Sequence, residues 1–161
     1  MDKMIILDMR IAKDTTSPLI SLPTAHLVPH RGIEGDRYYY HAGSFSTGDI
    51  PAYDVSIIEE DMYQELVQQS LRTGNVKGLR RNIIVSGCSL SSLIGQPFQI
   101  GTTLLQGIMP RRLQHLPLEQ VLAMRLHSGF GAQVLSEGTI CLGDELCLVK
   151  EHTLLLNERA T

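Results

Sequence analysis

The apolar residues of this chain fall into short runs, and glycines stand between many of these runs. Short apolar runs bounded by turn residues are typical of β-strands. They predict strands over residues 4–11, 24–28, 82–86, 97–101, 103–108, 131–135 and 145–149. The stretch 41–53, rich in Gly and Ser, predicts an irregular loop, and a loop of this length in a compact domain is more often functional than idle.

Two segments have the spacing of helices instead. Ser56 and Glu59 form the Ser-x-x-Glu pattern of a capping box, and apolar residues follow at helical spacing. We therefore expect a helix of about three turns that starts here and ends near Gly74. A shorter helix is expected over 117–127, with a proline at its start, and the tail 150–161 either frays or docks a final helical turn. Many short strands with two or three helices predict a mainly β fold, either a closed barrel or a sandwich.

The composition limits the choice of partners and compartments. With 161 residues and 43% hydrophobic content, the chain fits a single domain, with its core at about 5–149 and a tail at 150–161. The formal net charge is −3 and there is no Lys/Arg block, so nucleic acid is not expected as a partner. No apolar run approaches the roughly 18 residues of a membrane span, and an acid follows too closely on Met1 for a secretory signal. Three cysteines without Cys-x-x-Cys spacing indicate a reduced, cytoplasmic protein.

The segment from Gly32 to Tyr40 carries the most distinctive chemistry. Gly32 and Gly35 tolerate positive φ and close backbone approach, so they suit a tight turn with exposed amides. Asp36 can fix this turn or the neighbouring guanidinium, and Arg37 offers a planar fork of donors suited to phosphate or carboxylate. The segment is therefore either an anion cradle or a surface turn with a structural Asp–Arg pair. The spacing alone favours the structural pair.

Two further places combine polar groups with a strand end or a bend. Arg80, Arg81 and Asn82 precede an apolar strand. Adjacent strand residues point to opposite faces, so at most one of the two arginines shares a pocket with the neighbours of Asn82. His127 lies in a second Gly-rich bend, where a protonated imidazole can meet an anion. The alternative interpretations are that Arg80, Arg81 and Asn82 form a solvated entry to the strand and that His127 is an ordinary surface residue. No ligand-spaced carboxylate or histidine accompanies His127, so no protein-held metal site is expected.

The three cysteines differ in their neighbours. Cys88 follows Gly87 beyond an apolar run, where a thiol can be exposed. Cys141 and Cys147 stand among apolar residues typical of a core, where cysteine behaves as a small hydrophobe. A reactive thiolate needs a cationic neighbour that lowers its pKa, and none of the three has one nearby in sequence. A structural role is therefore expected for each of them.

Several segments together resemble the MOSC domain family, found at the C-terminus of molybdenum cofactor sulfurases and as stand-alone bacterial proteins. The likeness covers roughly residues 5–149, and the matching segments follow the family's order. They are Gly32-Ile33-Glu34-Gly35-Asp36-Arg37, the loop at 41–46, Val55-Ser56-Ile57-Ile58-Glu59, Arg80-Arg81-Asn82-Ile83, the Gly-punctuated stretch 87–101, and the closing segments 126–134 and 138–144. No single motif is decisive, whereas their succession in this order is specific.

The resemblance implies a closed β-barrel-like MOSC fold with two or three peripheral helices. It also implies a pocket for molybdenum cofactor (molybdopterin) or a related anionic ligand, and at the level of the family it implies sulfur-carrier chemistry and binding of molybdenum ion and pyridoxal phosphate. Carried onto this chain, the implied ligand-binding residues are Gly35, Asp36, Arg37, Arg81, Asn82 and His127. A molybdoenzyme or a cysteine desulfurase is the implied partner protein, and no membrane is involved.

The sequence departs from the family at one position that matters for the chemistry. Members usually place a cysteine just after the strand that corresponds to 103–108, and here Arg111 stands at that place, followed by Arg112. Persulfide chemistry needs a sulfur nucleophile, whereas arginines enrich a pocket in positive charge and add Arg111 to the expected ligand-binding residues. Three hypotheses stay open: a domain that binds the cofactor or another small anion without carrying sulfur, a persulfide sulfurtransferase that uses Cys88, and a non-catalytic interaction domain.

Overall fold

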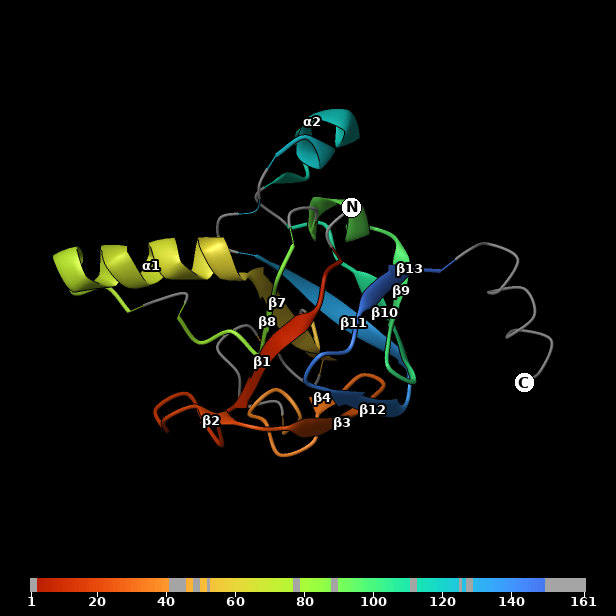
Figure 1. Cartoon of the computed structure of the whole chain (residues 1–161), viewed down its shortest axis with the longest axis horizontal. Helices are drawn as coiled ribbons and strands as arrows, with labels where there is room; N and C mark the ends of the chain where they lie inside the picture. The colour runs from red at the N-terminus through yellow and green to blue at the C-terminus, as the bar shows by residue number, and fades with distance from the viewer. Residues whose placement is uncertain are drawn as a thin grey trace.

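Strands dominate the computed structural model of the chain, as the short apolar runs predict (Figure 1). The structure describes residues 3–40, 46–47, 50–51, 53–76, 79–87, 90–110, 113–124, 126 and 129–149, with the backbone alone at 46–47 and 50–51. The strands are β1 (Ile6–Ile11), β2 (Ile20–Ser21), β3 (Thr24–Val28), β4 (Gly32–Ile33), β5 (Ser46–Thr47), β6 (Ile50–Pro51), β7 (Val55–Glu59), β8 (Ile83–Val85), β9 (Pro97–Ile100), β10 (Thr103–Gly107), β11 (Phe130–Ser136), β12 (Gly138–Cys141) and β13 (Leu146–Leu148). The helices are α1 (Glu60–Thr73), the short 3-10 helix η1 (Leu90–Leu93) and α2 (Leu118–Leu122).

Eight strands form one curled sheet in the order β13-β9-β10-β11-β7-β8-β1-β2. Strands β7 and β8 pair in parallel, and the other neighbours are antiparallel. The curl brings the chain around β1 close to the chain around β13. Two backbone hydrogen bonds join them, from the Ile6 amide to the Asp144 carbonyl (2.9 Å) and from the Leu146 amide to the Met4 carbonyl (2.8 Å). The prediction of a mainly β fold with few helices is confirmed. The structure shows a curled half-barrel, and the closed barrel stays a prediction.

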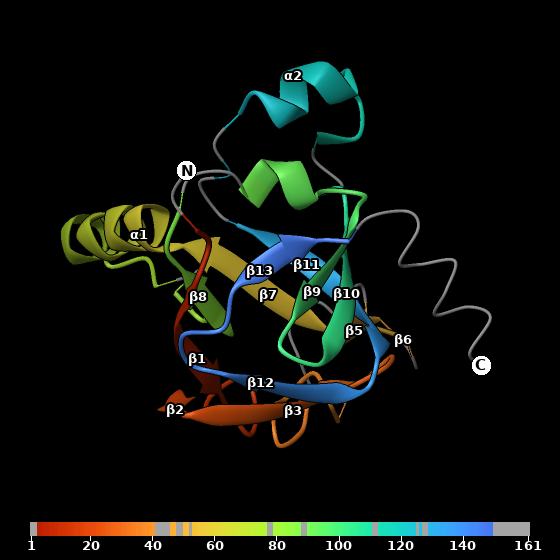
Figure 2. The same cartoon turned by 45° about the vertical axis from the view of Figure 1, so that its right-hand side comes forward.

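A second sheet, in the order β12-β3-β4, lies across one end of the large sheet. Figure 2 shows β12 and β3 side by side at this end. Strand β12 follows β11 almost directly, so the chain passes from one sheet to the other within a few residues. Gly138 allows this passage, because a Cβ there would lie 2.5 Å from the Thr103 hydroxyl oxygen. The remaining pair, β5 and β6, forms a small ladder inside the stretch 41–53 that the sequence predicts as an irregular loop.

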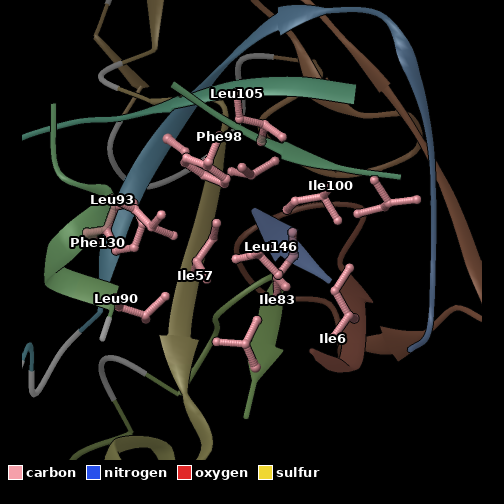
Figure 3. Packing of buried hydrophobic residues seen from close by; sticks show 14 of the residues in the cluster. Ile6, Ile57, Ile83, Leu90, Leu93, Phe98, Ile100, Leu105, Phe130 and Leu146 are labelled. Atoms are coloured by element: carbon pink, nitrogen blue, oxygen red, sulfur yellow. The ribbon is translucent and has the colours of Figure 1, made fainter. Parts of the chain in front are cut away.

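The concave face of the curled sheet encloses the main hydrophobic core. Figure 3 shows Ile57, Ile83, Phe98 and Phe130 packed together there, from four different strands. The rings of Phe98 and Phe130 meet edge to face, with centroids 6.4 Å apart, a favourable geometry for aromatic pairs. A smaller apolar cluster on the convex face attaches α1 to the sheet, and it consists of Ile58, Met62 and Ile84. The inner face is therefore closed by packing, which leaves the outer face beside α1 for polar groups.

Helix α1 begins later than the sequence predicts. Residues Val55–Glu59 form strand β7, and each of them is buried. The predicted capping box is wrong, because Ser56 lies within the strand and Glu59, the N-cap residue, makes no side-chain cap bond. Strand pairing with β8 on one edge and β11 on the other outweighs the local capping preference. The predicted end of the helix is correct, since Gly74 caps it in the left-handed conformation with φ 74°.

Helix α2 is shorter than the predicted helix over 117–127. It spans only Leu118–Leu122, where Val121 is buried while both terminal leucines are exposed. The Ser91 hydroxyl donates to the Leu122 carbonyl (3.0 Å) and so ties α2 to η1, an element the sequence pattern did not predict. The expected final helical turn at 150–161 lies outside the described residues. In the described part of the chain, no helix has both the length and the apolar character needed to cross a membrane.

Candidate functional site

A row of polar groups crosses the outer face of the large sheet near the N-terminal ends of β7 and β8. It starts at Arg10 on β1, continues through Asn82 and Ser56, and reaches Gly131 on β11. The Asn82 Oδ1 accepts hydrogen bonds from the Ser56 amide (3.0 Å) and hydroxyl (3.1 Å), and its Nδ2 donates to the Arg10 carbonyl (3.1 Å). Because Asn82 is fully buried, these bonds replace hydration and hold three strands in register.

The Gly-rich turn found in the sequence packs against this end of the sheet. Gly32 and Gly35 both have φ of 93°, a conformation that favours glycine. A Cβ at Gly32 would also collide with the backbone carbonyl oxygen of Asp54. The Arg37 amide donates to the carbonyl of Ala12, just beyond β1, at 2.7 Å. The turn is thus fixed to the strand end by its backbone before any side chain contributes.

Asp36 is the buried centre of this turn. Its Oδ1 accepts hydrogen bonds from the Ala12 amide (2.9 Å) and from the Arg37 Nη1 (3.1 Å), and its Oδ2 accepts one from the Tyr38 amide (3.3 Å). The side chain is completely shielded from solvent. Of the two interpretations that the sequence leaves open, this geometry is that of a structural Asp–Arg pair.

Arg37 extends from the turn towards the strand β8. Its Nη2 donates to the Arg80 carbonyl (2.8 Å), and its guanidinium lies 4.6 Å from the centre of the Tyr38 ring. Only 2% of the residue is exposed. Arg37 therefore joins the Gly-rich turn to the Arg-Arg-Asn segment, which lies far away in the sequence.

Two other arginines also bond to backbone carbonyls around this segment. Arg10 donates to the Tyr63 hydroxyl (2.7 Å) and to the carbonyls of Leu79 (2.9 Å) and Arg81 (3.1 Å). Arg80 donates to the carbonyls of Ser17 and Asp14, each at 2.8 Å. Burial and, after it, the nearby Arg37 charge lower the pKa of Arg80. Backbone carbonyl oxygens thus accept hydrogen bonds from all three arginines, and carboxylates also contact two of them, Asp36 beside Arg37 and Asp8 beside Arg10.

Arg81 differs from these three arginines. Its side chain is half-buried, and its Nε is shielded from solvent without a hydrogen-bond partner among the described residues. The Nε of Arg10 is also without a hydrogen bond, but it lies 3.9 Å from the Asp8 carboxylate. Within the described ranges Arg81 makes no ion pair of this kind. Its guanidinium is therefore the group in this cluster best able to meet an anion from outside.

Tyr53 and Tyr38 stand beside these guanidinium groups. Their rings lie 5.4 Å apart and their hydroxyl oxygens 3.4 Å apart. Burial raises the pKa of Tyr53, as does the neighbouring Tyr38, whereas the charges of Arg81 and Arg37 act in the opposite direction. Tyr53 lies in the stretch 41–53, whose length was its only sequence signal. The structure places the Tyr53 ring against Gly131, where a Cβ would collide with it.

Three of the predicted site residues cannot be placed in this cluster. Arg111, His127 and Cys88 lie outside the described residues. Among the described residues, Arg81 precedes the start of β8 and Gly87 lies beyond its end, so these two residues mark opposite ends of the strand. At the Gly87 end Glu59 is buried, and its Oε1 accepts a hydrogen bond from the Leu90 amide (3.2 Å). The sequence analysis expected Glu59 to cap a helix and did not identify it as a buried carboxylate.

The two described cysteines are not core residues. Cys141 is half-buried, and Cys147 is exposed, which contradicts the predicted burial. The alternation of side chains along β13 explains the exposure of Cys147, because Leu146 points inward and its neighbour Cys147 must point outward. Partial burial, followed by the charge of Glu145, raises the pKa of Cys147, which disfavours its thiolate. No group of three His, Cys, Asp or Glu side chains suited to a metal occurs among the described residues.

A shallow hollow follows the exposed face of α1, away from the arginines. Its lining comes from one helix and consists of Asp61, Gln64, Glu65, Gln68, Gln69 and Arg72. No second element among the described residues contributes to it, and mixed charges with glutamines are typical of a solvated helix face. The polar row and the Gly-rich turn, where several distant segments meet, form the better candidate site.

Comparison with known proteins identifies the fold. No family model matches this chain, and neither does any curated protein sequence. Among solved structures, the YuaD protein from Bacillus subtilis matches with a TM-score of 0.61 and 19% identity, over 89% of this chain and 94% of YuaD. These figures support a MOSC-like fold.

Two further structures share this MOSC-like fold. YiiM from Escherichia coli matches with a TM-score of 0.55 and 16% identity, over 91% of this chain and 70% of its own. YiiM from Geobacillus stearothermophilus matches with a TM-score of 0.52 and 19% identity, over 91% of this chain and 75% of its own. At such low identity the likeness concerns the fold alone, so the chemistry has to be argued from the residues described above.

Proposed function

We propose that this chain is a MOSC-family protein that binds molybdenum cofactor or a related anionic ligand, with Arg81 as the central contact. The observation that carries this proposal is the buried Nε of Arg81, which has no hydrogen-bond partner among the described residues and lies beside other guanidinium groups. A buried donor without a partner costs about 1–3 kcal/mol, so such a group is best explained by a ligand that satisfies it. Arginine suits the phosphate of a phosphorylated pterin, because its planar donors match phosphate oxygens.

The other predicted site residues take supporting roles in this proposal. Arg37 adds positive charge, while its own donors remain on Asp36 and on the Arg80 carbonyl. Gly35 and Asp36 shape the turn, and Asn82 fixes the segment just before β8 to which Arg81 belongs. Arg111 and His127 stay predicted contributors from the sequence.

The sulfur-carrier role of the family is not part of this proposal. The chain has Arg111 where members usually have the cysteine, and the exposed Cys147 has a raised pKa. We propose a domain that holds the cofactor and passes it to a partner such as a molybdoenzyme. Persulfide transfer through Cys88 stays a prediction of the sequence, tested by a mass increase of one sulfur on that cysteine after incubation with a cysteine desulfurase.

The proposed fold of the complete domain is the closed barrel of the resemblance. Two observations support closure, the antiparallel bridge between Ile5 and Glu145 and the hydrogen bonds that join the chain around β1 to the chain around β13. A closed sheet would give the N-terminal ends of β7 and β8 a rigid base, which suits a binding site.

Replacing Arg81 with Ala is expected to weaken binding of a phosphorylated pterin by about 10- to 150-fold. This corresponds to the roughly 1.5–3 kcal/mol of a hydrogen bond to a charged group. The dissociation constant is measured by isothermal titration calorimetry with the purified full chain. Arg81→Lys should retain part of the affinity, because the charge stays while the fork of donors is lost.

Arg72→Ala is the matched control, because Arg72 lies in the last turn of α1 and is exposed. It removes the same charge from the chain without touching the cluster. Equal affinity of the wild type and the Arg81→Ala variant would remove the proposed site, and equal losses in both variants would reduce it to a nonspecific charge effect.

A further inference from the structure

Arg10 on β1 joins helix α1 to the segment just before β8. Its Nη1 donates to the Tyr63 hydroxyl on α1 (2.7 Å), and its guanidinium lies 4.7 Å from the centre of the same ring. Its Nη2 donates to two backbone carbonyls, those of Leu79 (2.9 Å) and Arg81 (3.1 Å). Because the Arg10 side chain is only 12% exposed, water competes little for these bonds, and they hold the guanidinium in one place.

Two different arginines hold the backbone on either side of the Arg81 Cα. A peptide unit is planar, so a hydrogen bond to its carbonyl restrains the orientation of the whole unit. The unit before this Cα carries the Arg80 carbonyl, which accepts a hydrogen bond from the Arg37 Nη2 (2.8 Å). The unit after it carries the Arg81 carbonyl, which accepts the bond from Arg10.

The second of these peptide units is also held at its opposite edge. The Asn82 amide belongs to the same unit as the Arg81 carbonyl, and it donates to the Ser56 hydroxyl oxygen (2.9 Å). With both units restrained, the φ and ψ angles of Arg81 have little freedom, and these two angles set the direction of its Cα–Cβ bond. The backbone therefore orients the Arg81 side chain before any ligand binds.

We propose that Arg10 is a positioning residue of this site, which acts through Arg81 by holding the backbone that carries its guanidinium. The inference rests on the proposed function and adds to it the residue that orients the central contact. A side chain that is already oriented loses less conformational entropy on binding, so it binds an anion more tightly than a freely moving one. Arg10 need not touch the ligand, because both of its Nη atoms already donate to protein oxygens.

Substitution by lysine separates positioning from a simple effect of charge. Arg10→Lys keeps the positive charge but loses the planar fork that reaches a phenol and two carbonyls at once. Binding of a phosphorylated pterin to the full chain is measured by isothermal titration calorimetry. We expect Arg10→Lys to weaken binding by about five- to tenfold, whereas wild-type affinity in this variant would mean that Arg10 contributes charge alone and would overturn the inference.

A double-mutant cycle tests whether Arg10 acts through Arg81. In an Arg81→Ala background, Arg10→Lys should weaken binding by less than about twofold, because no guanidinium is left to orient. A loss of equal size in both backgrounds would show that Arg10 supports the fold in general, and the positioning role would be wrong. Arg72→Lys, on the exposed end of α1, is the matched control and should bind as the wild type does.

NMR relaxation of the free chain gives a second measurement that does not depend on binding. The order parameter of the Arg81 Nε–Hε bond should fall by about 0.2 or more in Arg10→Lys, because the guanidinium gains freedom. Tyr63→Phe serves if Arg10→Lys does not fold, since it releases one end of Arg10 and leaves the charge and the carbonyl bonds in place. It should lower the same order parameter and weaken binding by about two- to threefold.

The outcomes separate this inference from the function on which it rests. If Arg81→Ala leaves the affinity unchanged, the proposed site falls and the inference falls with it. If Arg81→Ala weakens binding while Arg10→Lys and Tyr63→Phe change neither the affinity nor the order parameter, the site stands and Arg10 has no positioning role.

Discussion

Replacing Asp36 with Ala is expected to lower the free energy of unfolding by about 3–5 kcal/mol, the largest effect of any single change considered for this chain. The carboxylate accepts hydrogen bonds from the amides of Ala12 and Tyr38 and from Arg37, and it is completely buried. Its loss would leave two amides without their acceptor and the buried Arg37 charge without its counter-ion. Since domains are stable by only about 5–15 kcal/mol, the variant should be close to unfolding.

Urea unfolding followed by circular dichroism measures this loss. Glu34→Ala is the matched control on the same turn, because Glu34 is exposed, and it should change the unfolding free energy by less than about 0.5 kcal/mol. The double variant Asp36→Leu with Arg37→Met should be more stable than Asp36→Ala, since it removes the unpaired charge together with the acid. A cost below about 1 kcal/mol for Asp36→Ala would show that the pair is solvated and that the turn is held by its backbone alone.

The strands were predictable where the apolar run ends at a turn residue. The prediction for 24–28 matches β3 (Thr24–Val28), and those for 97–101 and 103–108 match β9 and β10 to within a residue. In each case glycine or proline marks an end of the run, so the boundary is a local property of the sequence.

Strand β7 could not be predicted in the same way. Its five consecutive buried residues include Ser56 and Glu59, polar types that read locally as a helix start. Only the pairing partners β8 and β11, distant in sequence, make burial of these residues favourable, because they supply hydrogen bonds on both edges. The pattern of residues along one segment carries no information about pairing with strands that are distant in the sequence.

The candidate site shows the same division between local and distant information. The sequence identified Arg37 and Arg81 as chemically notable, and the fold brings their segments together through the carbonyl of Arg80. It did not identify Arg10 or Tyr53, because an isolated arginine on a strand and a tyrosine in a long loop carry no motif. Nor could it distinguish Asn82 as a ligand from Asn82 as a brace between strands, a distinction that depends on burial and on the position of Ser56.

Replacing Asn82 with Ala tests whether this residue braces the sheet beneath the site. We expect a loss of about 2–4 kcal/mol in unfolding free energy, because the buried Ser56 amide loses its acceptor and the Arg10 carbonyl loses a donor. Exchange of the Ser56 amide hydrogen should accelerate by more than the global loss of stability explains, since its own hydrogen bond is removed. Gln133→Ala, which removes an exposed carboxamide from β11 of the same sheet, should change neither quantity. If Asn82→Ala instead keeps its stability and loses only ligand affinity, the carboxamide contacts the ligand directly. The strands beneath Arg81 would then be held by their backbone ladders and apolar packing alone.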